Sequence, residues 1–430
     1  MFEFSILHAF LALFVIVILV YLGLKIHSAI TQTDIQDATS DPKLETKYKN
    51  QVQLLSDKIN PVSSARRPVT ELLGQNVMPE PEQCFVNFYS LGCRYTGYIG
   101  PMSEGYWDPD LAVQLAVNAG CRTFILEIDY LNECKGETVK YFPRIVVRDA
   151  QNKLRIKYNS NRPICNSPQH SNIRDVCEKI NFYAFAPGCQ NNTDPVVIVL
   201  YFLRQPPGSY KSKTVLDYYS NVAKALSPFQ LRLLKNELDG GTYYRQSQEG
   251  RLLINNIKDY SGKVLIFSNA NTMGFRETQL YSPNDDLDFL TNLRLMYTQT
   301  KLGITENDTS APFGILQTAE DYMSIPTDRS EEIADSTKLR WTVCFSQDPS
   351  KSVTKDIYNK ITSTYGVHCV PIQIFDIKNN EFMFTDKTFK TYSYIPKPEP
   401  LRYIKPPIVI PAEPNPSTDA KQGLLRAPTV

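Results

Sequence analysis

Histidine is nearly absent from this chain, which has four histidines in 430 residues. An excess of either charge is missing too, because 46 Lys and Arg balance 45 Asp and Glu, for a formal net charge of +1. A chain without a basic excess has no long-range field to attract a polyanion, so we do not expect nucleic acid as a partner. No cysteine pair has CxxC spacing, and GxGxxG, GxxxxGK and GxSxG motifs are absent. These absences argue against a zinc knuckle, a nucleotide-binding loop and a serine-hydrolase nucleophile.

A long apolar run covers residues 4–24, FSILHAFLALFVIVILVYLGL. At a rise of ~1.5 Å per residue, a helix of this length crosses a hydrocarbon layer of ~30 Å. A cleaved signal peptide is the rival interpretation, but no Lys or Arg precedes the run, and His27-Ser28-Ala29 is a poor cleavage site. We therefore expect an uncleaved single-pass anchor over residues 1–25, in a host or viral membrane. The charges that follow the run do not decide which side of the membrane carries the rest of the chain.

Cysteines and glycosylation sequons leave the compartment open. Seven of the nine cysteines lie between Cys84 and Cys189, which would suit a disulfide-braced region in an oxidising compartment. The sequons at Asn191 and Asn307 would suit a lumenal or outer face, although such triplets also arise by chance. Neither pattern fixes the topology or the disulfide pairing.

The composition divides the rest of the chain into three parts. Residues 26–81 are polar and are interrupted by Pro61, Pro68 and Pro79, which predicts a stalk. Nine of the 29 prolines lie between Pro396 and Pro428, and because proline lacks a backbone N–H donor, residues 406–430 are expected to form an extended tail. In residues 82–405, β-type apolar runs alternate with amphipathic stretches, the pattern of parallel strands joined by helices.

Several signals favour a closed TIM-barrel-like α/β fold for residues 82–405. Continuous apolar runs such as 196–200 predict strands buried on both faces, as parallel sheets require. Asp108-Pro109 predicts the start of a helix and Gly120 its end. Without a nucleotide-binding loop, the repeated strand–helix rhythm favours a barrel over an open sheet. We expect strands at 84–90, 122–130, 143–148, 195–203, 263–269, 340–345 and 367–375, and further helices at 171–185, 213–226, 285–295 and 352–365.

The order of these segments resembles the catalytic barrel of phosphoinositide-specific phospholipase C, with its X and Y halves. LAVQLAVNAGCRTFILEIDYL looks like the family's helix, its Gly-Cys-Arg and its Glu-x-Asp strand. NIRDVCEKINFYAFAPGCQNNTDPVVIVLYFL and KVLIFSN resemble later segments of the X half, and YSYIPKPEPLRY resembles the closing segment of the Y half. The resemblance spans about residues 84–403 and implies a distorted barrel of the phospholipase C-like type.

The resemblance also implies that this chain lacks the family's two catalytic histidines and part of the site for its calcium ion. Aligning Tyr95 with the tyrosine of the family's Ser-His-Asn-x-Tyr places Gly92 at the first histidine and Cys93 at the metal-binding asparagine. The remaining family positions fall here on other residue types: the second histidine on Val147 or Arg148, a strand acid on Tyr201, and a phosphate-contacting lysine near Phe267 or Ser268.

No other histidine is expected to replace them. His8 and His27 belong to the anchor and its edge, His170 lies in a polar loop, and His368 begins an expected strand. We expect structural or solvated roles for the last two, because nothing in the sequence orients either ring. A positioned acid or base contributes ~10²- to 10⁴-fold to a rate, so losing both predicts a barrel without catalytic residues.

Two acidic residues of the resemblance persist, Glu127 and Asp129. Positions i and i+2 of a strand face the same side, and at the C-terminal end of a barrel strand they project into the mouth. Two carboxylates could share a weakly held Ca²⁺ whose other ligands are oxygens from elsewhere or water. Alternatively, they pair with Arg94, Arg122 or Arg148 as a buried ion network.

We therefore expect a membrane-anchored, non-catalytic phospholipase C-like barrel that binds a lipid headgroup or a protein partner, or that serves as a structural membrane component. This interpretation requires no cofactor beyond a weak Ca²⁺, and such a reduced barrel would also suit a membrane or virion protein of a large DNA virus. The alternative is a divergent metal-dependent phosphodiesterase acting on phosphoinositides, with Asp149, Glu127 and Asp129 on the metal and Arg148 or Arg94 on the phosphate. A glycerophosphodiester-type hydrolase is weaker, because it too expects paired histidines.

Overall fold

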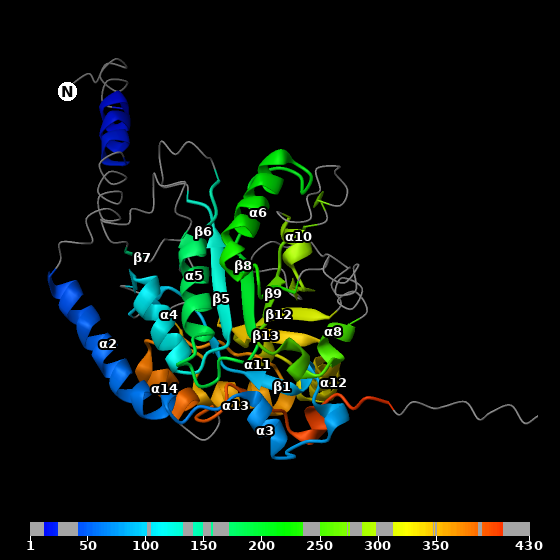
Figure 1. Ribbon diagram of the computed structural model, residues 1–430. Helices are drawn as coiled ribbons and strands as arrows, with labels where there is room; N and C mark the ends of the chain where they lie inside the picture. Colours follow the sequence, from blue (N-terminus) through cyan, green and yellow to red (C-terminus); the bar gives the residue numbers. More distant parts are fainter. Residues whose placement is uncertain are drawn as a thin grey trace, which may run out of the picture.

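The computed structural model describes most of the expected barrel and part of the N-terminal apolar run (Figure 1). Residues 13–24 form a helix, and within the described ranges no helix is both long and apolar enough to cross a bilayer. The expected anchor begins outside these ranges and stays a prediction, and Asp149, His170 and the tail 407–430 also lie outside them. The described residues are 13–24, 42–100, 105–131, 141–148, 156–157, 172–234, 250–272, 274–275, 286–297, 313–346, 348, 351–385 and 389–406.

Parallel strands surround a common interior. Five of them pair side by side, in parallel. In the order of pairing they are β2 (Gly92–Cys93), β5 (Thr123–Asp129), β8 (Val196–Phe202), β9 (Val264–Ser268) and β10 (Leu293–Arg294).

The ring continues and closes through shorter segments. β11 (Met296–Tyr297) follows β10 after one residue and pairs in parallel with β12 (Gly314–Thr318), which pairs in parallel with β13 (Trp341–Phe345). The chain after β13 then bridges in parallel from Cys369 to Val343 and from Ile372 to Cys93, which returns the ring to β2. The strands therefore form a closed parallel barrel, as the sequence predicts.

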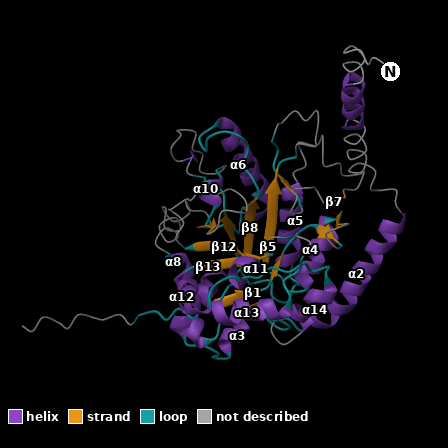
Figure 2. Cartoon of the chain, turned by 180° about the vertical axis from the view of Figure 1, so that it is seen from behind, coloured by secondary structure: helices purple, strands orange, loops and turns teal. Residues whose placement is uncertain are grey.

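Helices cover the outside of this barrel (Figures 1 and 2). On β5, Phe124 and Leu126 pack in the layer between strands and helices, whereas Ile125 packs in the interior with Val199 and Phe267. Because side chains alternate along a strand, each barrel strand is buried on both faces. The covering helices are α4 (Pro109–Asn118), α5 (Asn172–Ala184), α6 (Lys213–Ala225), α8 (Arg251–Ile254), α10 (Leu287–Leu290), α11 (Ala319–Met323), α12 (Ser330–Leu339), α13 (Lys355–Tyr365) and α14 (Ile377–Thr385).

Small elements complete the two ends. β1 (Phe88–Ser90) runs directly into β2 and pairs antiparallel with β14 (Tyr394–Pro396), so this pair lies at the N-terminal end of the strands, here called the base. At the opposite end, here called the mouth, β6 (Arg144–Ile145) pairs antiparallel with the last residues of β5. The remaining strands are β3 (Tyr98–Ile99), β4 (Gly105–Trp107) and β7 (Ile156–Lys157).

Several expected elements are shorter than the sequence pattern indicates. The expected strand 367–375 pairs only through single bridges, because Pro371 lies within it and has no N–H to donate. The expected helix 285–295 is wrong in its second half, where the chain turns into β10 and pairs with β9 instead. The expected strand 84–90 begins with a 3-10 turn, Phe85–Asn87.

Much of the expected stalk, residues 26–81, is helical. Residues 42–63 form α2 (Pro42–Ser63), followed by α3 (Val69–Gly74), and Leu55 and Ile59 are fully buried. Apolar residues at helical spacing lie on one face of α2, and the helix packs against α4 and α14. The expected stalk is therefore wrong for residues 42–81, which belong to the folded domain.

Arg66, just after α2, fastens this segment to the base. Its guanidinium is buried and donates to the carbonyls of Asn118 (3.2 Å), Phe389 (2.8 Å) and Ala119. The first and last of these belong to the C-terminal end of α4, where helix carbonyls lack intrahelical partners and attract positive charge. Burial lowers the pKa of Arg66 to about 10, so it stays charged near neutral pH. Gly120 follows with φ +99°, and a Cβ there would collide with this guanidinium.

The sequon and the cysteines have different roles from those the sequence suggested. Asn191 is buried, and its side-chain amide donates to Ser393 Oγ (2.6 Å) and Asp194 Oδ2 (3.3 Å) and accepts from Arg122 Nη2 (2.6 Å). All seven described cysteines carry free thiols, so a disulfide-braced region is wrong for them. The sequon at Asn307, Cys134 and Cys165 lie outside the described residues.

His368 is a buried structural residue at the base. Its Nε2 donates to the carbonyl of Val86 (2.7 Å), and its Nδ1 accepts from the backbone N–H of Thr342 (3.0 Å), which lies near the start of β13. Trp341 stacks on the ring at 6.1 Å between centroids. Burial lowers the pKa of His368 well below its usual value, so the ring is neutral in the folded protein. The structural role expected for it is confirmed by these contacts.

Replacing Arg66 is expected to destabilise the fold. The Arg66→Met variant leaves buried carbonyls at the end of α4 without a donor, so the free energy of unfolding should fall by ~2–4 kcal/mol. Arg67→Met serves as the control, because Arg67 is half exposed and pairs with Glu71 only at 3.8 Å. Urea unfolding followed by circular dichroism measures both, and equal midpoints for the two variants would refute the role of Arg66.

Stability should also depend on pH through His368. The unfolded chain takes up a proton on this histidine near pH ~6.5, while the folded chain keeps the ring neutral to lower pH. The free energy of unfolding should therefore fall as the pH drops below about 6.5, by up to ~1.4 kcal/mol per pH unit from this group. Urea midpoints between pH 5 and 8 test this, and the His368→Gln variant should show a shallower dependence than the unsubstituted chain.

Candidate functional site

Charged side chains gather at the mouth, where the barrel strands end. Arg94 follows β2, Glu127 and Asp129 end β5, and Arg204 follows β8. Because neighbouring parallel strands end on the same side of a barrel, these residues meet although they are far apart in the chain. Ligands bind at this end of such barrels, so the mouth is the candidate functional site.

Arg94 and Glu127 form a buried ion pair. Arg94 Nε donates to Glu127 Oε1 at 2.6 Å, and the two side chains are 6% and 3% exposed. Arg94 Nη1 also donates to the carbonyl of Ser346 (2.7 Å), and the guanidinium lies 4.4 Å from the ring centre of Phe345. Burial by itself lowers the pKa of Arg94, but the attraction of the Glu127 carboxylate outweighs it and raises the pKa. The two side chains are therefore joined by a charge-assisted hydrogen bond away from water.

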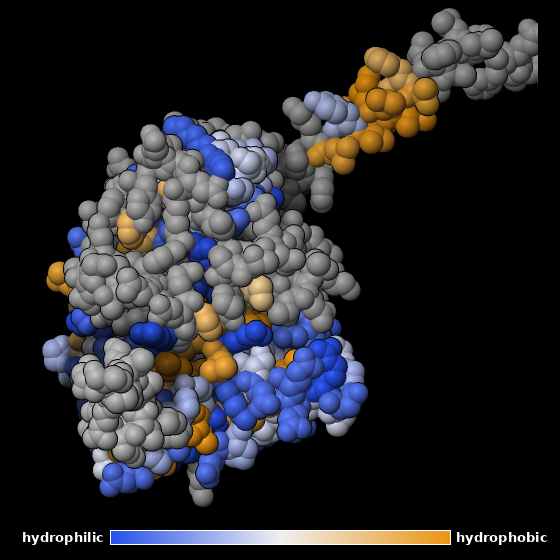
Figure 3. Space-filling model, turned by 90° about the vertical axis from the view of Figure 1, so that its right-hand side faces the viewer, coloured by the Kyte–Doolittle hydropathy of each residue, from blue (hydrophilic) through white to orange (hydrophobic). Residues whose placement is uncertain are grey.

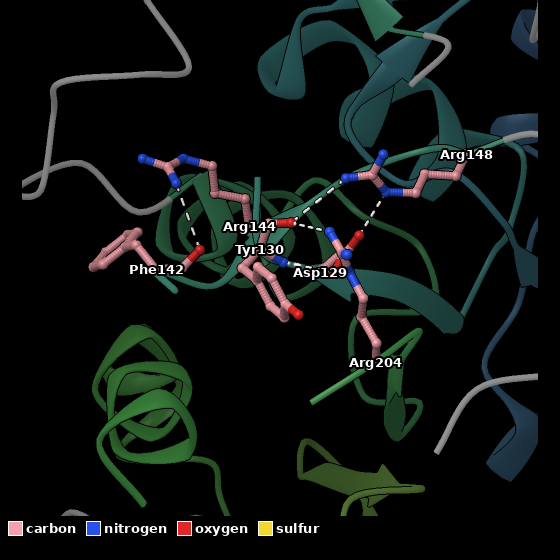
Figure 4. Close-up of polar contacts among 6 residues, drawn as sticks. All are labelled: Asp129, Tyr130, Phe142, Arg144, Arg148 and Arg204. Atoms are coloured by element: carbon pink, nitrogen blue, oxygen red, sulfur yellow. Dashed lines mark hydrogen bonds and ion pairs between the residues drawn. The ribbon is translucent and has the colours of Figure 1, made fainter. Parts of the chain in front are cut away.

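Asp129 lies between two arginines (Figure 4). Its Oδ2 accepts from Arg148 Nε (2.5 Å), and its Oδ1 accepts from Arg204 Nε (2.5 Å) and from the backbone N–H of Tyr130 (2.8 Å). Arg204 also donates to the carbonyl of Tyr130 (2.8 Å) and lies over its ring at 4.0 Å. Asp129 is fully buried, whereas the Arg204 side chain is 29% exposed. Both oxygens of this carboxylate are thus satisfied by charged donors.

The ion network that the sequence left as an alternative is present for two of its three arginines. Arg94 and Arg148 pair with Glu127 and Asp129, but Arg122 lies at the base and binds Asn191 instead. Among the described residues there is no group of three or more His, Cys, Asp or Glu that could hold a metal ion. The two carboxylates alone supply few of the ~6–8 oxygens that Ca²⁺ requires.

Sequence reasoning missed Arg204, the third arginine of the mouth. The signal was present, because Arg204 comes directly after the apolar run 196–203, and that run was expected to be a strand. A charged residue just past the end of such a strand lies at the mouth of a barrel. Asp149, the further candidate ligand, lies outside the described residues.

Packed side chains occupy the positions where the resemblance places catalytic residues. A Cβ on Gly92 would lie 2.5 Å from Cys369 Sγ, which leaves no space for an imidazole. Cys93 is buried and donates to the carbonyl of Arg94 (3.4 Å). Tyr201 is buried inside the barrel against the ring of Phe345, 5.2 Å between centroids. Val147 is fully buried as well.

Tyr95 combines two features that mark functional or strained positions. Its φ of 58° lies in the left-handed region, which costs a non-glycine residue ~1–3 kcal/mol. Its hydroxyl is buried, and no hydrogen-bond partner for it exists among the residues that the structure describes. Burial raises the pKa of Tyr95 well above its usual value, so the hydroxyl is protonated. No pattern in the sequence predicts this conformation.

Comparisons with known proteins give matches to solved structures only. No protein-family model and no curated protein matches the chain. PLC21 of S. officinalis is similar with a TM-score of 0.47 at 14% identity, over 77% of this chain and 40% of the other. PLC21 of L. pealei gives a TM-score of 0.45 at 14% identity, over 75% of this chain and 38% of the other. This chain thus spans about two fifths of the length of those two proteins.

A bacterial structure matches over nearly its whole length. The calcium-dependent phosphoinositol-specific phospholipase C from a Gram-negative bacterium, Pseudomonas sp, gives a TM-score of 0.43 at 12% identity, over 74% of this chain and 97% of the other. Its name is that of the family whose barrel the sequence resembles, and the likeness is one of fold.

Proposed function

We propose that this chain is a non-catalytic phospholipase C-like barrel that is held at a membrane by its N-terminal helix and binds an anionic headgroup at its mouth. The observation that carries this proposal is the pairing of Glu127 and Asp129 with arginines. A guanidinium that holds a carboxylate in a buried ion pair takes the place that a metal ion would need.

Among the described residues of the mouth there is no histidine to transfer a proton. Within the described ranges the one histidine is His368, which is neutral and hydrogen-bonded at the base. Glu127 and Asp129 accept hydrogen bonds from Arg94, Arg148 and Arg204, so both carboxylates are already engaged by side chains of the protein. General acid–base catalysis needs a group within hydrogen-bond reach of the substrate and with a suitable pKa.

An arginine of the ion network is available to an anion. Three arginines, Arg94, Arg148 and Arg204, pair with the two carboxylates Glu127 and Asp129. Arg204 is the most accessible of them, and its planar fork can bind a phosphate oxygen pair while its Nε stays on Asp129. A phosphate-bearing headgroup therefore fits the described part of the mouth.

The N-terminal apolar run supports attachment to a membrane. Residues 13–24 are all exposed, and Leu13, Phe14, Leu19 and Leu24 are each more than half exposed. Figure 3 shows this segment as mostly hydrophobic, whereas blue predominates in the described part of the body on this face. An apolar surface of this kind needs a nonpolar partner, and the sequence before it extends the run toward the length of a bilayer span.

A divergent metal-dependent phosphodiesterase is the second candidate. It is favoured by one observation, the position of two carboxylates on the same face of β5 at the mouth. A metal that generates hydroxide would have to displace the arginines from both carboxylates, with Asp149 as a further ligand. The two candidates differ in whether metal ions give activity.

Activity measurements separate these candidates. The purified full chain, incubated with phosphatidylinositol and Ca²⁺, Mg²⁺ or Mn²⁺, is expected to release no inositol phosphate above the metal-only background. Metal-dependent release that is abolished by Glu127→Gln would instead establish the second candidate, because the glutamine cannot replace the metal-binding charge.

Headgroup binding can be measured without a bilayer. Calorimetry with soluble inositol phosphates is expected to show binding that Arg204→Gln weakens ~10-fold, the loss of about one charge-assisted contact. Arg67→Gln at the base is the matched control and should leave the affinity unchanged. Equal affinities for the two variants would exclude the mouth as the binding site.

A further inference from the structure

Two buried basic side chains lie at the base of the barrel without an acidic partner. His368 and Lys397 are 1% and 0% exposed. Lys397 Nζ donates to the carbonyl of Thr337 (3.1 Å), and among the described residues no hydrogen bond or ion pair joins either side chain to a carboxylate. The charged group that acts on His368 is Lys397, and the one that acts on Lys397 is Lys338. Lys338 is itself paired with Asp335 (2.7 Å).

The hydrogen bonds of His368 require a neutral ring. Its Nε2 carries the proton that is donated to Val86, and its Nδ1 accepts the backbone N–H of Thr342. The Thr342 hydroxyl, 2.9 Å from Nδ1, can turn to accept a second ring proton, but the backbone N–H cannot. Protonation of Nδ1 therefore brings two donors together at 3.0 Å and places a second positive charge near Lys397.

The site of Lys397 is equally unsuited to a proton. An ammonium group has three N–H donors, and the acceptor that the structure provides is the single carbonyl of Thr337. Burial lowers the pKa of Lys397 well below its usual value, because a charge away from water needs a partner. As the pH falls, both side chains therefore favour a conformation in which water reaches them.

The two side chains hold the same short stretch, residues 397–403, here called the base segment. His368 binds Val86, and the next residue, Asn87, binds the base segment at both ends. The backbone N–H of Lys397 donates to the Asn87 carbonyl (2.9 Å), and that of Tyr403 donates to Asn87 Oδ1 (2.6 Å). The preceding strand, β14, pairs with β1 in a separate two-stranded sheet. A short segment outside the barrel strands opens at a lower cost than the core.

We propose that the base is an acid-sensitive switch, in which proton uptake by His368 and Lys397 releases the base segment from Asn87 while the barrel strands stay paired. Release takes Lys397 into water and away from His368, so both side chains bind protons more readily in the released form. His368 alone then raises the equilibrium constant for release up to about tenfold for each pH unit below about 6.5. The switch is separate from the ion network of Glu127 and Asp129, which lies at the mouth.

Hydrogen exchange in the full chain tests the switch. The amides of Lys397 and Tyr403 report on the base segment, and those of Val197 and Leu203, which donate at 2.8 and 2.9 Å within the barrel sheet, report on the barrel. Protection factors of the base amides should fall at least about tenfold from pH 7.5 to pH 5.5. At pH 5.5 they should lie at least about tenfold below those of the barrel amides, because the segment opens alone.

Neutral variants test the two side chains. The double variant His368→Gln, Lys397→Met removes both titrating groups, so the protection of its base amides should agree within about twofold at the two pH values. Lys360→Met, on the exposed side of α13, is the matched control and should keep the pH dependence of the unsubstituted chain.

Three outcomes would overturn the switch. Equal protection of the base amides at pH 7.5 and 5.5 would mean that acid does not release the segment. Base amides as well protected as the barrel amides at pH 5.5 would mean that the segment opens only with the whole barrel. A pH dependence that survives in the double variant would assign the acid response to other groups. The first two outcomes are measured on the unsubstituted chain, so they decide even where the double variant does not fold.

Discussion

Two buried carboxylates at the end of β5 impose the main constraint on this structure. An ionised carboxylate removed from water needs opposite charge or several donors, and leaving one without them costs several kcal/mol. In this chain arginines from three other segments meet that need, at Arg94, Arg148 and Arg204. The loops after β2, β6 and β8 are consequently held at the end of β5. Arg94 also donates to the carbonyl of Ser346, just after β13. The cations that organise the mouth are thus part of the chain itself.

The way the barrel closes requires glycine at position 92. The closing segment approaches β2 so tightly that a Cβ at Gly92 would meet Cys369 Sγ at 2.5 Å and the Cβ of Pro371 at 3.2 Å. Glycine is therefore required for the bridge from Cys93 to Ile372. A larger side chain at this position would collide with the closing segment.

The sequence predicts this fold best where a continuous apolar run marks a strand. The apolar runs that became β5, β8 and β9 were recognised because both faces of these strands are buried. The two-residue strands β2, β10 and β11 have no such run, since their pairing depends on neighbours distant in the chain. The helix α2 was not predicted because Pro61 lies within it and most of its residues are polar, although Leu55 and Ile59 are at helical spacing. For the site, pairing of carboxylates with arginines was foreseeable, but the choice of Arg204 over Arg122 depends on which end of the barrel each reaches.

The burial of Asn191 bears on the sequon that contains it. A glycan attaches to the side-chain nitrogen, and in the folded chain that nitrogen is engaged by Ser393 and Asp194 inside the base. A sugar at this atom would also separate Arg122 from its partner Asn191. Glycosylation at Asn191 and completion of the fold are therefore mutually exclusive, and a transferase could modify this residue only on a nascent chain that would afterwards be unable to close its base.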